Sequence, residues 1–430
     1  MTARLLGALG RSGFELAEAL TKTGRSQSVA LGGEAEGARA ARERGWAVRV
    51  GTGGRALFVA GSGEPPESGE GWPEPVEGAL RLPPPRAVPS WRPPADLDAP
   101  LLGEAEGFDL LRSVASRLAR QLPGAGVVTA SIEDGASESR VVNSRGVEAA
   151  FRSRGATTWL EGVREVGDRR TTAVVEDWAP AARTLLPERL AARLADRLVV
   201  EGGPDFEGRE RWDVVLAPAA AARLLSGLLP LFVGIDAPEL WKEYRDRTGR
   251  IGSAAVRVVD DGRAPFGLPV PVDAEGMPTR RIVLVDAGAP RQPLLAWEQA
   301  DPPATVASGC TRRPGWRDRP ERGPTHLFLE GDGQLAPSAL LAGVRRGAYL
   351  LEAFAGGSID VQANRFSLPV AGFALRNGGV AGAFRRARLQ GSIGAFLHGV
   401  EAAARDVRLF ALDGLIGAPT LRVTGLELSG

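Results

Sequence analysis

Cysteine and histidine are scarce in this sequence of 430 residues. It has one cysteine, Cys310, and two histidines, His326 and His398. A single cysteine excludes an internal disulfide framework and is typical of proteins from a reducing compartment. Each histidine stands alone rather than in a metal-binding motif, so we interpret both as structural side chains.

Lysine is nearly absent as well. Lys22 and Lys242 are the only two lysines, and arginine supplies the rest of the 53 basic residues. Because 52 acidic residues balance them, the net charge is only +1, whereas nucleic-acid binders carry a concentrated positive excess. The arginine-rich run from 312 to 322 also contains Asp318 and Glu321. We interpret it as a solvated loop and expect no nucleic-acid partner.

Long apolar runs are missing too. The longest, residues 224–234, is far shorter than the roughly 20 residues that span a bilayer. The N-terminal segment has neither the apolar core nor the cleavage site of a signal peptide. We therefore expect no membrane association and a cytoplasmic location.

The composition that remains is that of a globular protein, with 43% hydrophobic and 24% charged residues. A chain of this length exceeds one hydrophobic core, so two or three domains are expected. The 56 glycines and 32 prolines favour many turns and short elements over long helical bundles.

A first unit is expected at residues 1–60. Residues 14–20 (FELAEAL) have apolar positions at helical spacing, and residues 38–44 (ARAARER) suggest a helical turn. Residues 26–33 between them have the pattern of a strand.

A β-hairpin is expected to end this unit, with strands at 46–50 and 56–60. Gly51, Gly53 and Ala56 fit the G-x-G-x-x-A pattern of a dinucleotide site. Such a site needs a helix directly after the glycines, whereas residues 57–59 continue a strand. We interpret the glycines as a turn and expect no bound cofactor.

Proline dominates the next segment, which we place at residues 61–104. Ten prolines lie between positions 65 and 94. Proline removes amide donors and fixes φ, so neither a helix nor a central strand can persist there. This segment is expected to be a linker or an extended surface strap.

A middle unit is expected at residues 105–205. Residues 108–122 form the clearest amphipathic helix, and a second helix is expected at 186–198. Several strand candidates separated by turn residues lie between them. The order of helix, strands and helix predicts an α+β unit with an antiparallel sheet.

The last unit, residues 206–430, has short strands and many turns. Asn377 and Gly378 lie between two alternating runs and predict a hairpin. Gly425 shifts the alternation of the final strand, as a bulge would. The fold class predicted for the whole chain is α+β, with short helices, antiparallel sheets and a large β-rich C-terminal domain.

Residues 214–234 contain no His, Glu, Asp or Cys. A zinc site needs three or four such ligands, and a catalytic site also needs a base. No such site can be assembled from this segment, and both histidines are isolated, so we predict no catalytic residue, no metal ligand and no cofactor site in this chain.

Acidic residues come in close pairs at Asp260-Asp261 and at Asp273 and Glu275. Turns with side-chain to backbone hydrogen bonds explain them best. A weaker hypothesis is a hydrolase that uses Asp260, Asp273 and Glu275 with a hard cation. If any of these residues binds substrate, the candidates are Asp273, Glu275 and Arg280.

Residues 258–288 (VVDDGRAPFGLPVPVDAEGMPTRRIVLVDAG) carry a recognisable pattern. The stretch resembles the opening of the C-terminal domain in the TldD/TldE (PmbA) family. Residues 323–333, 345–397 and 416–430 continue the resemblance, and weaker similarity covers residues 24–34, 46–60 and 131–151. The resemblance spans nearly the whole chain except the proline-rich segment.

The TldD-type subunit of that family carries HExxxH on a helix that follows a VVL…LL segment, and a later cysteine completes its zinc site. Aligning Leu224-Leu225 with that segment puts Ser226, Gly227 and Leu231 at the motif positions, and no cysteine follows Cys310. The chain therefore resembles the TldE/PmbA-type subunit. The resemblance implies a heterodimer with a zinc-bearing TldD-like partner that cleaves unfolded peptides.

One alternative keeps the fold but not the partner. In it the chain is a stand-alone peptide-binding or scaffolding protein that forms a homodimer and has no hydrolase activity.

Overall fold

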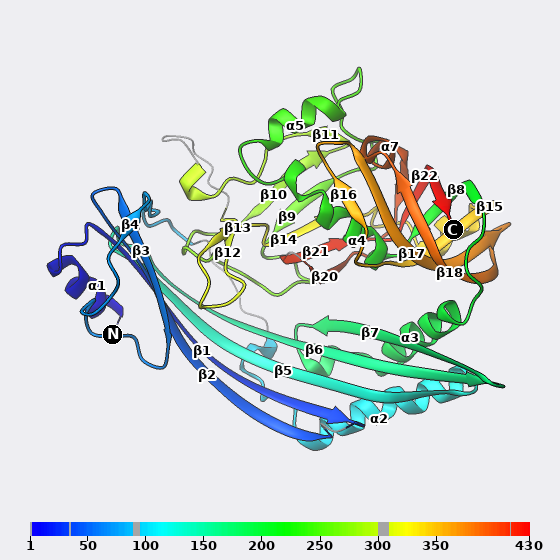
Figure 1. The fold of residues 1–430 in the computed structure, drawn as a ribbon, viewed down its shortest axis with the longest axis horizontal. Coiled ribbons are helices and arrows are strands. Elements are labelled where there is room, and N and C mark those ends of the chain that lie inside the picture. The colour runs from blue at the N-terminus through cyan, green and yellow to red at the C-terminus, as the bar shows by residue number, and fades with distance from the viewer. Residues whose placement is uncertain (1, 34–35, 89–94, 300–308, 413) are drawn as a thin grey trace.

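The molecule is built around a long curved sheet, with the C-terminal part of the chain on the concave side of that sheet (Figure 1). The computed structural model describes residues 2–33, 36–88, 95–299, 309–412 and 414–430. The strand order in the curved sheet is β4-β3-β2-β1-β5-β6-β7. These strands are β1 (Leu16–Leu31), β2 (Gly37–Thr52), β3 (Arg55–Ser62), β4 (Val76–Glu77), β5 (Ala125–Asn143), β6 (Glu148–Val166) and β7 (Arg169–Ala179).

Apolar residues cover the convex face of the sheet because side chains alternate between its two faces. Ile132, Leu160 and Val175 are buried there in one cluster with residues of two helices. These helices are α2 (Glu104–Gln121) and α3 (Pro187–Glu201), and α1 (Thr2–Arg11) packs at the other end of the sheet near Trp46. The concave face carries more polar residues, together with apolar contacts to the C-terminal part, such as those of Leu20 and Val141 with Trp316.

Two predicted helical segments are strands, so those predictions are wrong. Residues 14–20 lead into β1, and residues 38–44 lie inside β2. β1 pairs antiparallel with β2 on one side and with β5 on the other over almost its whole length. These ladders satisfy the backbone and override the weak helical periodicity.

The predicted helices at 108–122 and 186–198 are confirmed as α2 and α3, and the hairpin around Gly53 is confirmed as β2–β3. Between the end of β3 and the start of α2, the described residues of the proline-rich segment contain only the two-residue edge strand β4 and a short 3₁₀ helix at Ala95–Asp98. It follows the sheet as an extended strap: Leu82 is buried, and Asn143 donates a hydrogen bond of 2.9 Å to the carbonyl of Pro83. Residues 89–94 of this segment lie outside the described residues.

The boundary predicted between units 1–60 and 105–205 does not divide the sheet, because β1 of the first unit pairs with β5 of the second. The bounds of the four segments themselves stay predictions.

The first sheet of the C-terminal part has the strand order β11-β10-β9-β14-β21-β20. Its strands are β9 (Val258–Asp261), β10 (Arg281–Asp286), β11 (Ala289–Pro290), β14 (His326–Leu329), β20 (Arg408–Leu412) and β21 (Gly414–Ala418). A separate hairpin of β12 (Thr311–Arg312) and β13 (Glu321–Arg322) lies between β11 and β14 in the chain.

The second sheet closes on itself, since β15 pairs with both β8 and β17 at the two ends of the path β8-β22-β18-β17. Its strands are β8 (Arg209–Leu216), β15 (Arg346–Ala353), β16 (Ser358–Asp360), β17 (Arg365–Arg376), β18 (Gly379–Gly391), β19 (Val400–Ala403) and β22 (Leu421–Ser429). The helices here are α4 (Pro218–Gly227), α5 (Ala237–Tyr244), α6 (Pro337–Ala342) and α7 (Ile393–Gly399), with 3₁₀ turns at Leu229–Leu231 and Trp297–Gln299.

Two local predictions for the C-terminal part are confirmed, the hairpin turn at Asn377-Gly378 and the bulge at Gly425. Asn377 and Gly378 have φ of 49° and 76° and form the turn between β17 and β18. Gly425 has φ of 77° and lies where the register of β22 shifts against β8. The predicted α+β class is confirmed, although the β8–β15 and β14–β21 pairs are parallel. Within the described residues, no helix combines the length and apolar character needed to cross a lipid bilayer.

A buried group of charges joins the curved sheet to the C-terminal part. We call Glu18, Arg49, Arg313 and Glu275 the Glu18 cluster. Arg49 donates to Glu18 at 2.9 and 2.6 Å and to Glu275 at 2.6 Å. Arg313 donates to Glu18 at 2.6 Å. One carboxylate of the sheet is therefore held between two guanidinium groups, one of which comes from the C-terminal part.

Replacing Glu18 by alanine leaves Arg49 and Arg313 buried without their shared carboxylate. Removing one partner of a buried ion pair costs about 3–5 kcal/mol, so we expect Glu18→Ala to lower the free energy of unfolding by roughly that amount in urea denaturation. Glu43→Ala is the control, because it removes an exposed ion pair with Lys22 on the same sheet. It should change the free energy of unfolding by less than about 1 kcal/mol. Similar small losses for both variants would contradict the role of the cluster.

Candidate functional site

A cleft lies between the concave face of the curved sheet and the C-terminal part. It has a volume of about 620 Å³, within the range of ligand-binding pockets. β1, β5, β6 and β7 form its floor, while α3, α4, the end of β15 and β20 form its walls. We call this cavity the cleft.

The register of the strands determines which side chains form the floor of the cleft. Ser28, Glu133, Thr157 and Trp178 are directly opposite one another across four strands. The next row on the same face contains Ser131, Trp159 and Glu176. The floor therefore combines two tryptophans with exposed carboxylates, whereas Ile132, between Ser131 and Glu133, belongs to the apolar cluster of the convex side.

The opposite wall is more apolar. Phe354, Phe410 and Leu412 line it together with Ala219 and Arg223 of α4. Aromatic rings on the floor and on this wall can take apolar side chains of a ligand, while the polar groups fix its orientation.

Ion pairs hold one end of the cleft together. Asp177 of β7 accepts hydrogen bonds of 2.8 and 2.9 Å from Arg408 of β20, and its carboxylate lies 2.9 Å from Arg193 of α3. We call these three residues the Asp177 cluster. Next to it, Trp178 Nε1 donates to the carbonyl of Leu409 at 2.7 Å. Burial lowers the pKa of Arg408 to about 10, against the opposing effect of Asp177, so the arginine remains charged at neutral pH.

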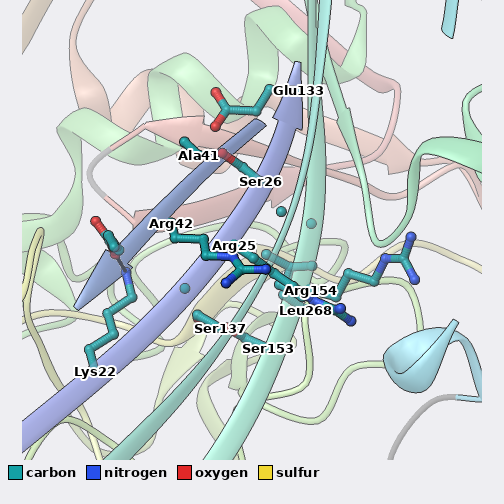
Figure 2. Close-up of a pocket in the computed structure, with 15 residues that line it drawn as sticks. Lys22, Arg25, Ser26, Ala41, Arg42, Glu133, Ser137, Ser153, Arg154 and Leu268 are labelled. Atoms are coloured by element: carbon teal, nitrogen blue, oxygen red, sulfur yellow. Dashed lines mark hydrogen bonds and ion pairs between the residues drawn. The ribbon is translucent and has the colours of Figure 1, made fainter. Parts of the chain in front are cut away.

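A second cavity of about 480 Å³ continues along the sheet and shares Glu133 with the cleft. Figure 2 shows Glu133 at one end of it and Arg25 and Arg42 near its middle. Small residues line much of it, including Gly24, Gly135 and Gly155. Leu268 of the C-terminal part packs over Gly155, where an added Cβ would lie 3.5 Å from its side chain, an ordinary van der Waals distance.

The sequence suggested three residues for substrate binding, Asp273, Glu275 and Arg280. None of them lines the cleft or the second cavity. Asp273 is buried and accepts hydrogen bonds from the amides of Glu275 and Met277 at 2.9 Å. Glu275 belongs to the Glu18 cluster, and Arg280 is exposed.

The loop around Asp273 is also tied to β12. Thr311 donates its amide to Asp273 at 3.1 Å and its hydroxyl to Glu275 at 3.0 Å. Burial raises the pKa of both carboxyls, and the charge of Arg49 partly offsets the effect on Glu275. Both side chains are thus engaged in holding the loop and the sheet together.

Asp260 lies apart from this loop, in β9. It accepts hydrogen bonds from the Thr325 hydroxyl at 3.0 Å and from the His326 amide at 2.9 Å. Burial raises its pKa to about 7 and lowers the pKa of His326 to about 4. His398 lies elsewhere, on α7, with Nε2 3.3 Å from the carbonyl of Tyr244.

Metal ligands are not gathered at any point of the described residues: no three His, Cys, Asp or Glu side chains are grouped so as to hold an ion. Cys310 is buried, and burial raises the pKa of its thiol. α4 offers only alanine, leucine, arginine, serine, proline and glycine.

The cleft itself was missed from the sequence. Its signal lies in the alternation of Thr157, Trp159 and Glu161 with Val174, Glu176 and Trp178, which puts tryptophan and carboxylates on one strand face. The pairing of these strands with β5, and the position of α4 opposite them, depend on contacts between distant parts of the chain.

Comparison with known proteins gives one family and a set of similar folds. Residues 209–430 match the model of the PmbA/TldA metallopeptidase C-terminal domain. The fold is similar to that of TldE from Thermococcus kodakarensis, with a TM-score of 0.83 and 20% identity over 98% of both chains. A candidate modulator of a DNA gyrase from Thermotoga maritima gives a TM-score of 0.81 and 18% identity over 99% of both chains.

A similar protein from Bacteroides thetaiotaomicron, also described as a candidate modulator of DNA gyrase, gives a TM-score of 0.78 and 17% identity over 100% of this chain and 98% of that one. At such identities these likenesses establish the fold alone. Comparison with curated proteins gives no match.

The raised pKa of Asp260 predicts a pH-dependent difference in stability. A carboxyl whose pKa rises on folding stabilises the protein below its unfolded pKa of about 4, and this contribution is lost as the pH rises through the folded pKa of about 7. Asp260→Asn stays neutral, so its free energy of unfolding relative to the parent should increase between these pH values. Urea unfolding of both proteins across this pH range measures the difference in their free energies of unfolding. A difference that does not change with pH would contradict a carboxyl that is buried and largely protonated in the folded state.

Proposed function

The chain belongs to the family defined by the PmbA/TldA metallopeptidase C-terminal domain, and from that premise we propose that it is a non-catalytic subunit of the TldE/PmbA type. In this proposal it pairs with a TldD-like subunit that carries HExxxH and zinc, and the pair acts on unfolded peptides. The chain itself holds no cofactor.

The observation that carries the proposal is the composition of α4. In the resemblance noted above, the zinc motif lies on the helix after a VVL segment, and here α4 directly follows Val214, Val215 and Leu216 of β8. Six residues of α4 are buried, and none of its side chains is a zinc ligand. The residues present do not fit a zinc ion, so no hydrolytic step is assigned to this chain.

The shape of the cleft supports a peptide as the ligand. β7 is the last strand of the curved sheet, and among the described residues it pairs only with β6. An open strand edge can bind an extended peptide through main-chain hydrogen bonds. Val174 of β7 is exposed, and it lines the cleft together with Glu176 and Trp178, so a peptide added at this edge would lie beside Trp178.

Copurification tests the pairing. When the chain is co-expressed with an HExxxH-bearing homologue from the same source, we expect one complex on size exclusion, with zinc in the partner and peptide hydrolysis only when both subunits are present. Metal analysis of each separated subunit and assays of each alone provide the controls.

Two results would contradict this assignment. Stoichiometric zinc and peptide hydrolysis by the chain alone would make it an enzyme in its own right. A stable homodimer that binds peptides but does not associate with the homologue would favour the stand-alone binding protein.

A further inference from the structure

Two carboxylates on the floor of the cleft have no partner among the described residues. Glu133 of β5 and Glu176 of β7 are both exposed, and neither side chain makes a hydrogen bond or an ion pair there. The other two carboxylates that line the cleft are engaged, Asp177 in the Asp177 cluster and Glu352 with Arg197 at 3.3 Å. Glu133 and Glu176 are therefore free to pair with a ligand.

Little positive charge remains in the cleft to balance these two acids. Arg193 belongs to the Asp177 cluster. Arg197 has its ion pairs with carboxylates and also lies over the ring of Phe354, 4.7 Å from the ring centroid. Arg223 of α4 lines the opposite wall and is the one arginine of the cleft without an ion pair to a described residue. The floor is therefore the acidic side of the cleft.

The pKa of a neighbouring acid reports the same surplus of negative charge. Burial raises the pKa of Glu352, and the charges of Arg197 and Arg193 oppose this rise. The charges of Glu201 and Glu176 add to it. The Glu176 carboxylate thus lies close enough to repel another acid of the cleft, and a bound cation would relieve this repulsion.

An indole ring lies on the strand between the two free carboxylates. Trp159 of β6 is directly opposite Glu176 in the ladder with β7. In the ladder with β5 its direct partner is Ser131, which makes Glu133 its diagonal neighbour. Side chains at such positions lie about 5–8 Å apart. Trp159 is half-buried, lines the cleft, and has neither a second ring nor a cation over it among the described residues.

The aromatic rings of the opposite wall are already occupied by cations. Arg197 lies over Phe354 and Arg408 lies over Phe410, with the guanidinium carbon 4.7 and 5.4 Å from the ring centroids. Trp159 has no such contact, although indole attracts a cation more strongly than the ring of phenylalanine does. The floor therefore offers an unused ring with a free carboxylate on either side.

We propose that Trp159, Glu176 and Glu133 bind a basic side chain, lysine or arginine, of an extended peptide in the cleft. The inference rests on the proposed peptide function and deepens it, because it names a side chain that this chain selects. The cation lies over the indole, and the two carboxylates balance its charge. The apolar stem of the side chain packs along the aromatic surface of the floor.

Peptides that differ in one side chain test this site. Fluorescein-labelled Gly-Ser-Ala-X-Ala-Ser-Gly with an amidated chain end is titrated with the full-length protein, and binding is followed by fluorescence anisotropy. The central residue is lysine, glutamate, or norleucine, which has the lysine stem without the ammonium group. The lysine peptide should bind about tenfold more tightly than the norleucine peptide, and the glutamate peptide should bind more weakly than either.

Variants of the floor report on the three residues themselves. Glu176→Gln and Glu133→Gln should each weaken the lysine peptide about threefold and leave the norleucine peptide unchanged. Glu176→Lys should make glutamate the preferred residue, and Trp159→Leu should reduce the ratio of lysine to norleucine affinity. Glu138→Gln is the matched control, because Glu138 is also an exposed carboxylate of β5 but lies outside the cleft. It should change the binding of neither peptide.

Three results would overturn the inference. Equal binding of the lysine and norleucine peptides would remove the site but leave peptide binding itself intact. Binding of none of the peptides would remove the site together with the proposed peptide ligand, whereas copurification measures subunit pairing separately. A preference for lysine that both Glu176→Lys and Trp159→Leu leave unchanged would place the basic side chain elsewhere.

Discussion

The structure depends on two carboxylates of the curved sheet, each held between two arginines. Glu18 lies between Arg49 and Arg313 at one end, and Asp177 lies between Arg193 and Arg408 at the other. In each cluster one arginine comes from the C-terminal part. Because buried charges must be paired and hydrogen-bonded, these contacts fix the distance between the sheet and the C-terminal part. The second cavity lies along the strands between the two clusters, and the cleft adjoins the Asp177 cluster.

The chemistry of the cleft is limited by α4, which has no side chain that could bind a metal ion. A helix of alanine and leucine packs well against β15 and β21 but cannot hold an ion. Beside it, arginine and carboxylate side chains both line the cleft. In our proposal, this helix occupies the position at which the TldD-type subunit carries its zinc motif, and it has no metal ligand here. Catalysis is then left to the partner, and this chain contributes binding and orientation.

Local features of the fold could be predicted from the sequence, and contacts between distant segments could not. The turn at Asn377-Gly378 needs only residues that tolerate positive φ, so it is encoded within a few positions. Residues 14–20 look helical in isolation, yet pairing with strands that end near residues 52 and 143 makes them part of a sheet. The same limit applies to the site. Asp273 and Glu275 stand out in the sequence as close acids, but their roles depend on Arg49, 226 residues before Glu275.

The location of zinc in the assembled complex tests the central claim most directly. Crystals of the chain with its HExxxH-bearing partner, measured at the zinc absorption edge, should give one anomalous peak at the partner's motif and none beside α4 of this chain. A peak beside α4, coordinated by side chains of this chain, would contradict the account.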